Sequence, residues 1–331
     1  MLKRIFILTV LIVVGTTAGY TQQQPLYSQY MLNTFLVNPA VAGAEGLTAF
    51  HLTAREQWVG YNEGPSTYAL SAQTRILKTS FRNRSRLIKS RTRRRRPSGR
   101  VGMGAFVYND INARIRRTGF QGTYAYHIYM RDVQLSFGGS LAAYQFRVNV
   151  TPNDTYDPLV PDPLIVAGKI NQKMSTDVNF GMLVSTEKYY AGFSATNIFQ
   201  TAFQFGSGSS NEAYKILRQY YLIGGYRFEP YKSDFAIEPS ILLTFTERKS
   251  TSTDLNIKAY YKQDYWAGIS FRTVGAMVMM FGTRYHQFTF GYAFDYNFND
   301  LSNLSRAGSH ELMIGYKLGD TARRYRWLNR F

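Results

Sequence analysis

Large apolar side chains alternate with polar or small ones throughout residues 252–318. Between Phe288 and Tyr296 every second residue is aromatic, and similar alternation runs through 254–261 and 309–318. A period of two is typical of strands with one apolar and one polar face, and about ten residues suffice to cross a bilayer as a tilted strand. The pattern therefore predicts which residues face lipid (Phe288, Phe290, Tyr292, Phe294) and which face a lumen (Gln287, Thr289, Asp295).

The rest of the chain favours strands over helices as the elements that cross the membrane. After the N-terminus, no stretch has the roughly eighteen consecutive apolar residues that a spanning helix requires. Aromatic residues make up 16% of the 331 residues, and 27 are glycine, a composition that suits a lipid-facing sheet. With no cysteine, the chain forms no disulfides and carries no acylated cysteine, so we expect sheet closure to stabilise it.

The first nineteen residues have the features of a secretory signal peptide. Lys3 and Arg4 precede an apolar run from Ile5 to Val14, and small residues at 15–19 provide a cleavage region. A short anchor helix is the alternative, but the apolar run is too brief for it. The sequence therefore predicts an exported protein whose mature chain begins near residue 20.

The mature chain divides into a lead (20–46), an antiparallel barrel (47–318) and a basic tail (319–331). About fourteen strands are predicted in the barrel, and single-chain bacterial outer-membrane barrels have an even number. The first strand, near 47–57, should pair with the last, 309–318, so that no edge meets lipid. The predicted strands are 47–57, 66–77, 100–108, 118–130, 133–148, 176–185, 188–197, 217–228, 233–246, 252–261, 264–272, 275–284, 286–296 and 309–318.

The lengths of the connections predict an orientation in an outer membrane. If the lead starts in the periplasm, the tight turns fall on the periplasmic side, as is usual for such barrels, and both termini are periplasmic. A basic segment, 78–99, is long yet falls on the same side. The other long connections would face outward (Trp58–Pro65, Asn109–Arg117, Asn149–Ser175, Ile198–Ile216, Asn297–Gly308).

Five blocks together resemble a known family. They read YSQYMLNTFLVNPAVAG, REQWVGYNEGPSTYALSAQT, DFAIEPSILLTF, STDLNIKAYYKQDYWAGISFRT and FGYAFDYNFNDLSNLSRAGSHELMIGYKL, and they are similar, in this order, to signature blocks of the PorP/SprF outer-membrane proteins of Bacteroidota. The resemblance covers nearly the whole mature chain, except for the arginine run at 82–96 and the tail. It gives a structural role to several motif residues (Asn38, Pro39, Gly43, Gly60, Gly308, His310, Glu311).

The resemblance implies a barrel that serves type IX secretion and gliding without enzymatic activity or a cofactor. The implied partners are other type IX secretion or gliding proteins, secreted adhesin C-terminal domains, and periplasmic ring or peptidoglycan-linked proteins.

The residues themselves give little sign of catalysis or metal binding. The four histidines are dispersed and lack partners at metal-site spacing. Gly102-Met103-Gly104 lies in a strand-like run with no following helix, so strand packing explains it better than phosphate binding. Asp154, Asp157 and Asp162 could offer oxygens to calcium, but they lack EF-hand spacing, and a proline-stiffened loop is the simpler interpretation.

The net charge of +18 is concentrated in two segments, 75–100 and the tail. The signal peptide and the barrel pattern argue against nucleic acid as the partner. An acidic periplasmic protein or anionic headgroups could bind the basic loop, and a merely solvated loop is the simpler alternative. Trp58 and Tyr61 are either interfacial aromatics or a partner contact. The candidate partner-binding residues are thus Trp58, Tyr61, Arg82, Arg84, Arg86, Arg93, Arg94, Arg95 and Arg96.

Two functions are compatible with these features. The favoured one is a scaffold or accessory for export or surface attachment of large adhesins. The alternative is a passive or ligand-specific outer-membrane channel, because a barrel of this size can enclose a narrow lumen.

Overall fold

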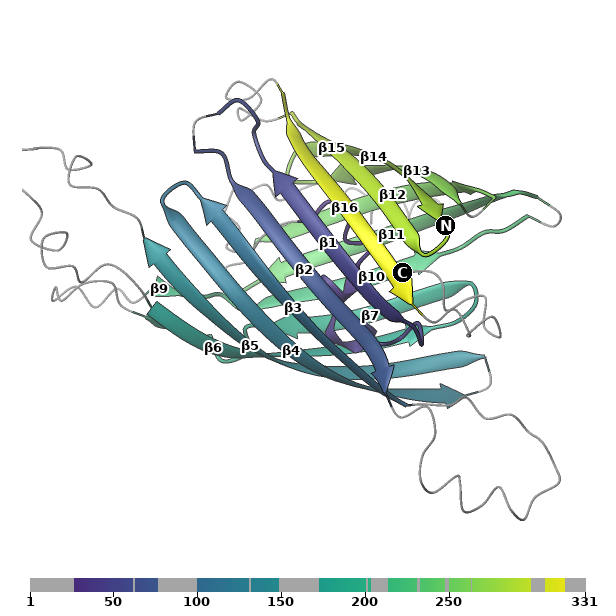
Figure 1. Cartoon of the computed structure of the whole chain (residues 1–331), viewed down its shortest axis with the longest axis horizontal. Coiled ribbons are helices and arrows are strands. Elements are labelled where there is room, and N and C mark those ends of the chain that lie inside the picture. The colour runs from purple at the N-terminus through teal and green to yellow at the C-terminus, as the bar shows by residue number, and fades with distance from the viewer. Residues whose placement is uncertain are drawn as a thin grey trace, which may run out of the picture.

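A closed antiparallel barrel of fourteen strands forms the body of the protein (Figure 1). The computed structural model describes residues 27–61, 63–76, 100–130, 132–148, 173–200, 202–203, 214–230, 233–247, 250–262, 264–298 and 307–318. The predicted signal peptide, the basic loop with its arginines, the tail and the three loop aspartates lie outside the described residues. Within the described part, no helix is long and apolar enough to cross a membrane.

All fourteen predicted strands are present, with ends that differ by a few residues. The barrel strands are β1 (Thr48–Glu56), β2 (Ser66–Ile76), β3 (Val101–Asn112), β4 (Ile115–Met130), β5 (Val133–Val148), β6 (Lys173–Ser185), β7 (Tyr189–Thr196), β10 (Gln219–Tyr226), β11 (Phe235–Thr246), β12 (Thr251–Tyr261), β13 (Tyr265–Arg272), β14 (Ala276–Tyr285), β15 (Phe288–Asn297) and β16 (Ser309–Leu318). β8 (Ala202–Phe203) and β9 (Tyr214–Lys215) form a separate two-stranded sheet. The prediction of an even-numbered barrel is confirmed.

The first and last strands close the barrel, as predicted. β1 pairs antiparallel with β16, and the register runs from Thr48 opposite Leu318 to Glu56 opposite His310. Backbone groups in hydrocarbon have no water to bind, so an unpaired edge there would be costly. The seam therefore gives hydrogen-bond partners to the backbone edges of two strands that are far apart in the sequence.

Side chains alternate between lipid and lumen along β15. Phe288 and Phe290 are exposed on the outer face, and Thr289 and Asp295 are buried inside, which confirms these assignments. Tyr292 and Phe294 are partly covered, because Tyr292 packs on Phe281 and Phe294 packs on His310. The prediction for Gln287 is wrong. It lies exposed in the turn before β15, where its backbone oxygen accepts a hydrogen bond from the Lys317 amide (2.9 Å).

The connection predicted at Asn109–Arg117 is another error. β3 continues to Asn112 and β4 begins at Ile115, so most of this polar segment is strand. Cross-strand hydrogen bonds explain the extension, because Thr67 donates to Asp110 (2.6 Å) and Thr118 donates to Asn109 (3.0 Å). Asparagine and aspartate are turn formers by preference, but here their side chains have partners on neighbouring strands.

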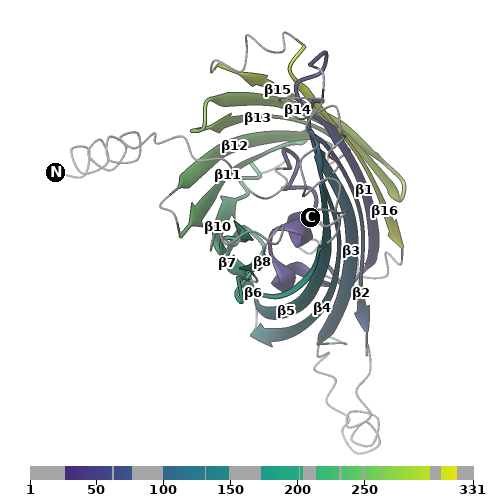
Figure 2. The same ribbon diagram turned by 90° about the vertical axis from the view of Figure 1, so that its left-hand side faces the viewer.

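The lead enters the interior of the barrel and fills part of it. Residues 27–46 carry two short 3₁₀ turns, η1 (Thr34–Leu36) and η2 (Pro39–Val41), and nearly all of these residues are buried. Figure 2 shows this segment in purple, surrounded by the strands. The apolar core of the protein forms where the lead meets inward-facing side chains of the wall (among them Phe106, Leu183, Ile223, Trp266, Val278 and Met313).

An arginine on the lipid face should destabilise the barrel according to its depth. Phe281, near the middle of β14, is 58% exposed on the outer face. Phe281→Arg should lower the free energy of unfolding by about 2–4 kcal/mol, the cost of arginine near the bilayer midplane. Tyr285→Arg, at the end of the same strand, should cost about 0–1 kcal/mol. Equilibrium unfolding in lipid vesicles measures both, and equal costs would contradict the orientation of β14.

Candidate functional site: a plugged lumen

Residues 27–46, called the plug from here on, are held at their centre by Asn38. Its side chain accepts a hydrogen bond from the Ala40 amide (2.9 Å) and so caps η2, which Pro39 opens. The same side chain donates to the backbone oxygens of Met182 (3.0 Å) and Phe193 (3.3 Å) on β6 and β7. Asn38 and Pro39, predicted as structural motif residues, thus join the plug to the wall.

Glycines in the wall let the plug backbone lie directly on it. A methyl group at Gly102 of β3 would overlap the Ala42 carbonyl oxygen, and one at Gly138 of β5 would overlap the backbone of Pro39. Gly43 has a φ of +67°, and a Cβ there would lie 2.6 Å from the Thr74 oxygen. Only glycine permits both this backbone conformation and this close approach, which supports the structural role predicted for Gly43.

The end of the plug that leads into β1 is bound by basic side chains. Arg75 donates to the backbone oxygens of Gly43 (2.9 Å) and Ala44 (2.5 Å). Lys317 pairs with the Glu45 carboxylate (2.8 Å). The Gly43 oxygen also accepts from the Gly46 amide (3.1 Å), and the Ala44 oxygen accepts from the Gln134 side chain (3.3 Å), so the carbonyl groups at this end of the plug are fully partnered.

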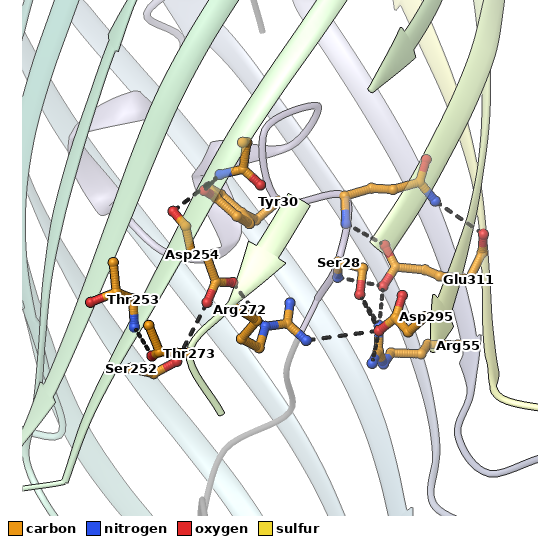
Figure 3. Close-up of polar contacts among 12 residues, drawn as sticks. Ser28, Tyr30, Arg55, Ser252, Thr253, Asp254, Arg272, Thr273, Asp295 and Glu311 are labelled. Atoms are coloured by element: carbon orange, nitrogen blue, oxygen red, sulfur yellow. Dashed lines mark hydrogen bonds and ion pairs between the residues drawn. The ribbon is translucent and has the colours of Figure 1, made fainter. Parts of the chain in front are cut away.

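The beginning of the plug binds to carboxylates near the seam (Figure 3). The backbone amides of Ser28 and Gln29 donate to Glu311 at 2.7 and 2.8 Å. The Ser28 hydroxyl donates to Asp295 (2.6 Å). Arg55 contacts Ser28 and also pairs with Asp295 (2.6 Å) and Glu311 (3.1 Å). We call Ser28, Arg55, Asp295 and Glu311 the seam cluster.

Further ion pairs extend the seam cluster along the wall. Arg272 binds Asp254 at 3.0 Å and lies 3.8 Å from Asp295. Next to it, the Asn256 side chain donates to the Tyr30 hydroxyl (2.6 Å). Burial raises the pKa of the Tyr30 hydroxyl well above its ordinary value, so this group stays protonated and neutral. The start of the plug is therefore fixed by polar groups of β1, β12, β15 and β16.

The buried charges of the lumen are close to balance. Eleven charged side chains are buried in the described residues, five basic and six acidic (Arg55, Arg75, Arg117, Lys258, Arg272; Glu45, Asp177, Glu238, Asp254, Asp295, Glu311). Lys317 supplies a partner for one of the acids. Buried charges are tolerated when they are paired and hydrogen-bonded. These buried charges can hold the plug in position. In the described residues, no group of three or more potential ligands could hold a metal ion.

Two predicted motifs, one with Trp58 and Gly60 and the other with Gly308, meet at the end of the barrel opposite Leu318. The Trp58 amide donates to the Ser309 hydroxyl (3.2 Å), and the Val59 amide donates to the Gly308 oxygen (2.9 Å). Gly60 and Gly308 have φ values of +89° and +70°, which glycine adopts without strain. Trp58 and Tyr61 are in edge contact, with ring centroids 6.5 Å apart, and Tyr61 is exposed.

The end of the barrel opposite Leu318 is called the mouth from here on. Of the remaining motif residues, one lies at the mouth and the other in the lumen. His310 bonds the Tyr292 hydroxyl (2.6 Å) at the mouth, whereas Glu311 points inward and binds the plug. Sequence reasoning singled out Glu311 but missed its partners, Ser28, Arg55 and Asp295. A usable signal was present, because Arg55, Asp254 and Asp295 are charged residues at inward positions of apolar strands.

A model of one protein family matches residues 19–316, and its description is type IX secretion system membrane protein PorP/SprF. The chain belongs to the PorP/SprF family. The family resemblance drawn from the five blocks is therefore confirmed, and the barrel is of the outer-membrane type. Four of the five blocks supply charged side chains to the ion pairs of the lumen, the DFAIEPSILLTF block through Glu238, which lies 3.7 Å from Lys258. The first block forms most of the plug, and its Ser28 hydroxyl donates to Asp295.

Solved barrels are similar to this PorP/SprF chain only in fold. Omp33 of Acinetobacter baumannii is 9% identical with a TM-score of 0.42, covering 82% of this chain and 98% of its own. The KdgM porin is 10% identical with a TM-score of 0.35, covering 81% and 98%. A mutant of the TodX monoaromatic hydrocarbon channel is 11% identical with a TM-score of 0.39, covering 86% and 92%. These scores carry no functional argument. No curated protein matches the sequence.

Removing Arg55 should destabilise the protein strongly. Arg55→Ala leaves Asp295 and Glu311 without their shared buried counter-charge, and breaking such a pair typically costs about 3–5 kcal/mol. Arg218→Ala breaks a partly exposed pair with Glu247 and should change stability little. Denaturant unfolding of both variants in vesicles tests the difference. A loss no greater for Arg55→Ala than for Arg218→Ala would contradict the role given to the seam cluster.

Proposed function

We propose that this PorP/SprF protein acts in type IX secretion as a closed, non-enzymatic scaffold that supports export or surface attachment of large adhesins. The observation that carries the proposal is the plug. Its backbone rests on wall glycines on one side, and its amides bind seam carboxylates on the other. A barrel filled in this way presents two surfaces to partners and holds them in a membrane.

The plug argues against the alternative of a passive channel. A passive pore needs a continuous aqueous path, which larger barrels provide through a polar, unfilled interior. Here Phe35, Ala40 and Ala42 of the plug are wholly buried in the lumen. Their contacts with the wall belong to the apolar core of the protein. Such packing favours a structural role for the interior.

The lengths of the turns support an orientation for the scaffold. At the end where β16 finishes, β14 and β15 are joined by a tight turn at 286–287, as are β12 and β13 at 262–264. Short turns in outer-membrane barrels are usually periplasmic, so this end and the chain's C-terminus would face the periplasm. Segment 78–99 would lie on the same side, and the mouth with Trp58 and Tyr61 would face outward.

This orientation assigns a partner class to each side. On the outward side, the aromatic pair of half-buried Trp58 and exposed Tyr61 suits contact with an exported adhesin's C-terminal domain. On the periplasmic side, the arginines of segment 78–99 suit an acidic surface, such as a ring or peptidoglycan-linked protein of the secretion machine. Both contacts are compatible with a barrel that conducts nothing.

The scaffold proposal predicts two results for the purified wild-type protein. Reconstituted in a planar bilayer it should give no steady ion conductance, because the plug occupies the lumen and packs against the wall. Immobilised from a native membrane extract it should retain other type IX secretion proteins. A steady pore without any retained secretion protein would favour the channel instead.

The arginine run predicts a salt-sensitive partner contact. Replacing Arg93, Arg94, Arg95 and Arg96 with serine should weaken capture of an acidic periplasmic partner, and raised salt should have the same effect on the wild type, because exposed charges are screened beyond about 8–10 Å. The matched control replaces the same four residues with lysine, which keeps the charge and should keep most of the capture. Unchanged capture by the serine variant would show that the run is only solvated. Loss of binding to anionic vesicles alone would assign it to lipid headgroups.

A further inference from the structure

Two arginines lie side by side on the outer face of the barrel, near the mouth. Arg116 of β4 is directly opposite Arg147 of β5, and both are exposed. Their neighbours in the sequence, Arg117 and Phe146, are buried, so the alternation of the strands turns Arg116 and Arg147 outward. We propose that this arginine pair binds a phosphate group of lipid A, the membrane anchor of lipopolysaccharide. The proposal rests on the orientation given above for the scaffold, in which the mouth faces outward.

The position of the arginine pair creates a repulsion that an anion removes. Directly opposite Cβ atoms on one face of an antiparallel pair lie about 4.5–5.5 Å apart, and like charges there are destabilising. In the described part of the chain, the Arg116 and Arg147 side chains have neither an ion pair nor a hydrogen bond. The next pair on the same face, Thr118 and Gln145, is uncharged. An anion between the two guanidinium groups would therefore turn a repulsive pair into a binding site.

Phosphate is an anion that suits this geometry. A guanidinium group donates two parallel hydrogen bonds to phosphate oxygens, and two such groups on neighbouring strands can share one phosphate. The pairing of β4 with β5 is continuous from Ile115 opposite Val148 to Met130 opposite Val133, so the backbone holds the two arginines at a fixed spacing. The site thus needs no rearrangement of the barrel before it binds.

The arginine pair stands just beyond the apolar band of the outer face. On β4 the outward positions from Phe120 to Met130 carry apolar or aromatic side chains and one glycine, and Phe120, Tyr124 and Met130 are each about half exposed. At about 3.3 Å per residue and a tilt of about 40°, this stretch spans about 25 Å along the membrane normal, the usual height of the apolar band. Arg116 lies about 10 Å further along the normal, and its long side chain can bring the guanidinium to the headgroup layer.

Polar groups between the arginine pair and the apolar band fit the sugar part of lipid A. The Thr118 hydroxyl donates to Asn109 (3.0 Å) and can still accept a hydrogen bond, and the Gln145 amide can donate and accept. Lipid A is a phosphorylated disaccharide that carries acyl chains. Its phosphate, sugar and acyl chains would therefore meet the arginine, polar and apolar rows of the wall in that order, whereas a free phosphate ion would use only the first row.

Binding of lipid A to the purified protein in a neutral detergent tests the site. Native mass spectrometry should show that the wild type retains bis-phosphorylated lipid A. A double variant, Arg116→Gln with Arg147→Gln, should bind it about tenfold more weakly, because hydrogen bonds to charged groups are lost. Lipid A without its phosphates should bind the wild type as weakly as the intact lipid binds the double variant.

A matched control removes an exposed arginine at the other end of the same wall. Arg100 directly precedes β3 and donates to the Tyr126 hydroxyl (3.4 Å). Because Arg100 is far along the strands from the arginine pair, Arg100→Gln should leave the affinity for lipid A unchanged.

Thermal stability in the same detergent separates lipid binding from a structural role. Without lipid A, the double variant should melt at the same temperature as the wild type or higher, because it lacks the repulsion between opposite arginines. With lipid A, the melting temperature of the wild type should rise more than that of the variant, because a ligand stabilises the folded state that binds it.

Three results would overturn the proposal. One is equal affinity of the wild type and the double variant for lipid A. Another is a lower melting temperature of the double variant without lipid A, which would give the arginines a structural role. The third is an equal rise in melting temperature with inorganic phosphate at the same concentration, which would make the site one for free phosphate. Retention of secretion proteins is measured separately, so failure of lipid A binding leaves the scaffold role standing.

Discussion

The structure depends on closure of the barrel at the seam between β1 and β16. Lipid offers no hydrogen bonds to a strand edge, so the first and last strands must pair. The register of that pairing places Arg55 directly opposite Glu311, 256 residues later in the chain. Because β15 pairs with β16, Asp295 also lies within reach of Arg55. Closure of the sheet thus pairs the backbone groups of β1 and β16, and it also assembles the seam cluster that binds the plug.

The interior shows how a lumen can be filled by an apolar core and by buried ion pairs together. Buried ion pairs gain little net stability, because desolvation offsets the attraction between the charges. What the seam cluster provides is position, since the donors of Ser28 and Gln29 meet carboxylates at a single height in the barrel. Glycines on the facing strands then allow the plug backbone to pack. The seam side holds the plug by polar groups and the glycine side by close backbone contact, and the scaffold proposal rests on both.

Much of the fold could be predicted from the sequence because strand periodicity is a local property. The alternation at 252–318 identified strands and their faces, and the even strand number followed. The plug could not be predicted in the same way, because residues 27–46 have no regular period and their partners lie on strands far along the chain. Asn38 and Gly43 were singled out from the sequence as structural residues, but strand periodicity played no part in this. Their actual contacts, with Met182, Phe193 and Thr74, depend on tertiary register.

Hydrogen–deuterium exchange of the protein in lipid nanodiscs tests the plugged lumen most directly. The amides of Ser28 and Gln29 bind a buried carboxylate, and those of Ala40, Val41, Ala42 and Ala44 have acceptors within the plug. If the plug occupies the lumen, peptides covering 27–46 should exchange slowly, with residues 34–43 as protected as the barrel strands. Exchange of these peptides within seconds, while the strands remain protected, would show that the plug does not reside in the barrel and would contradict the account.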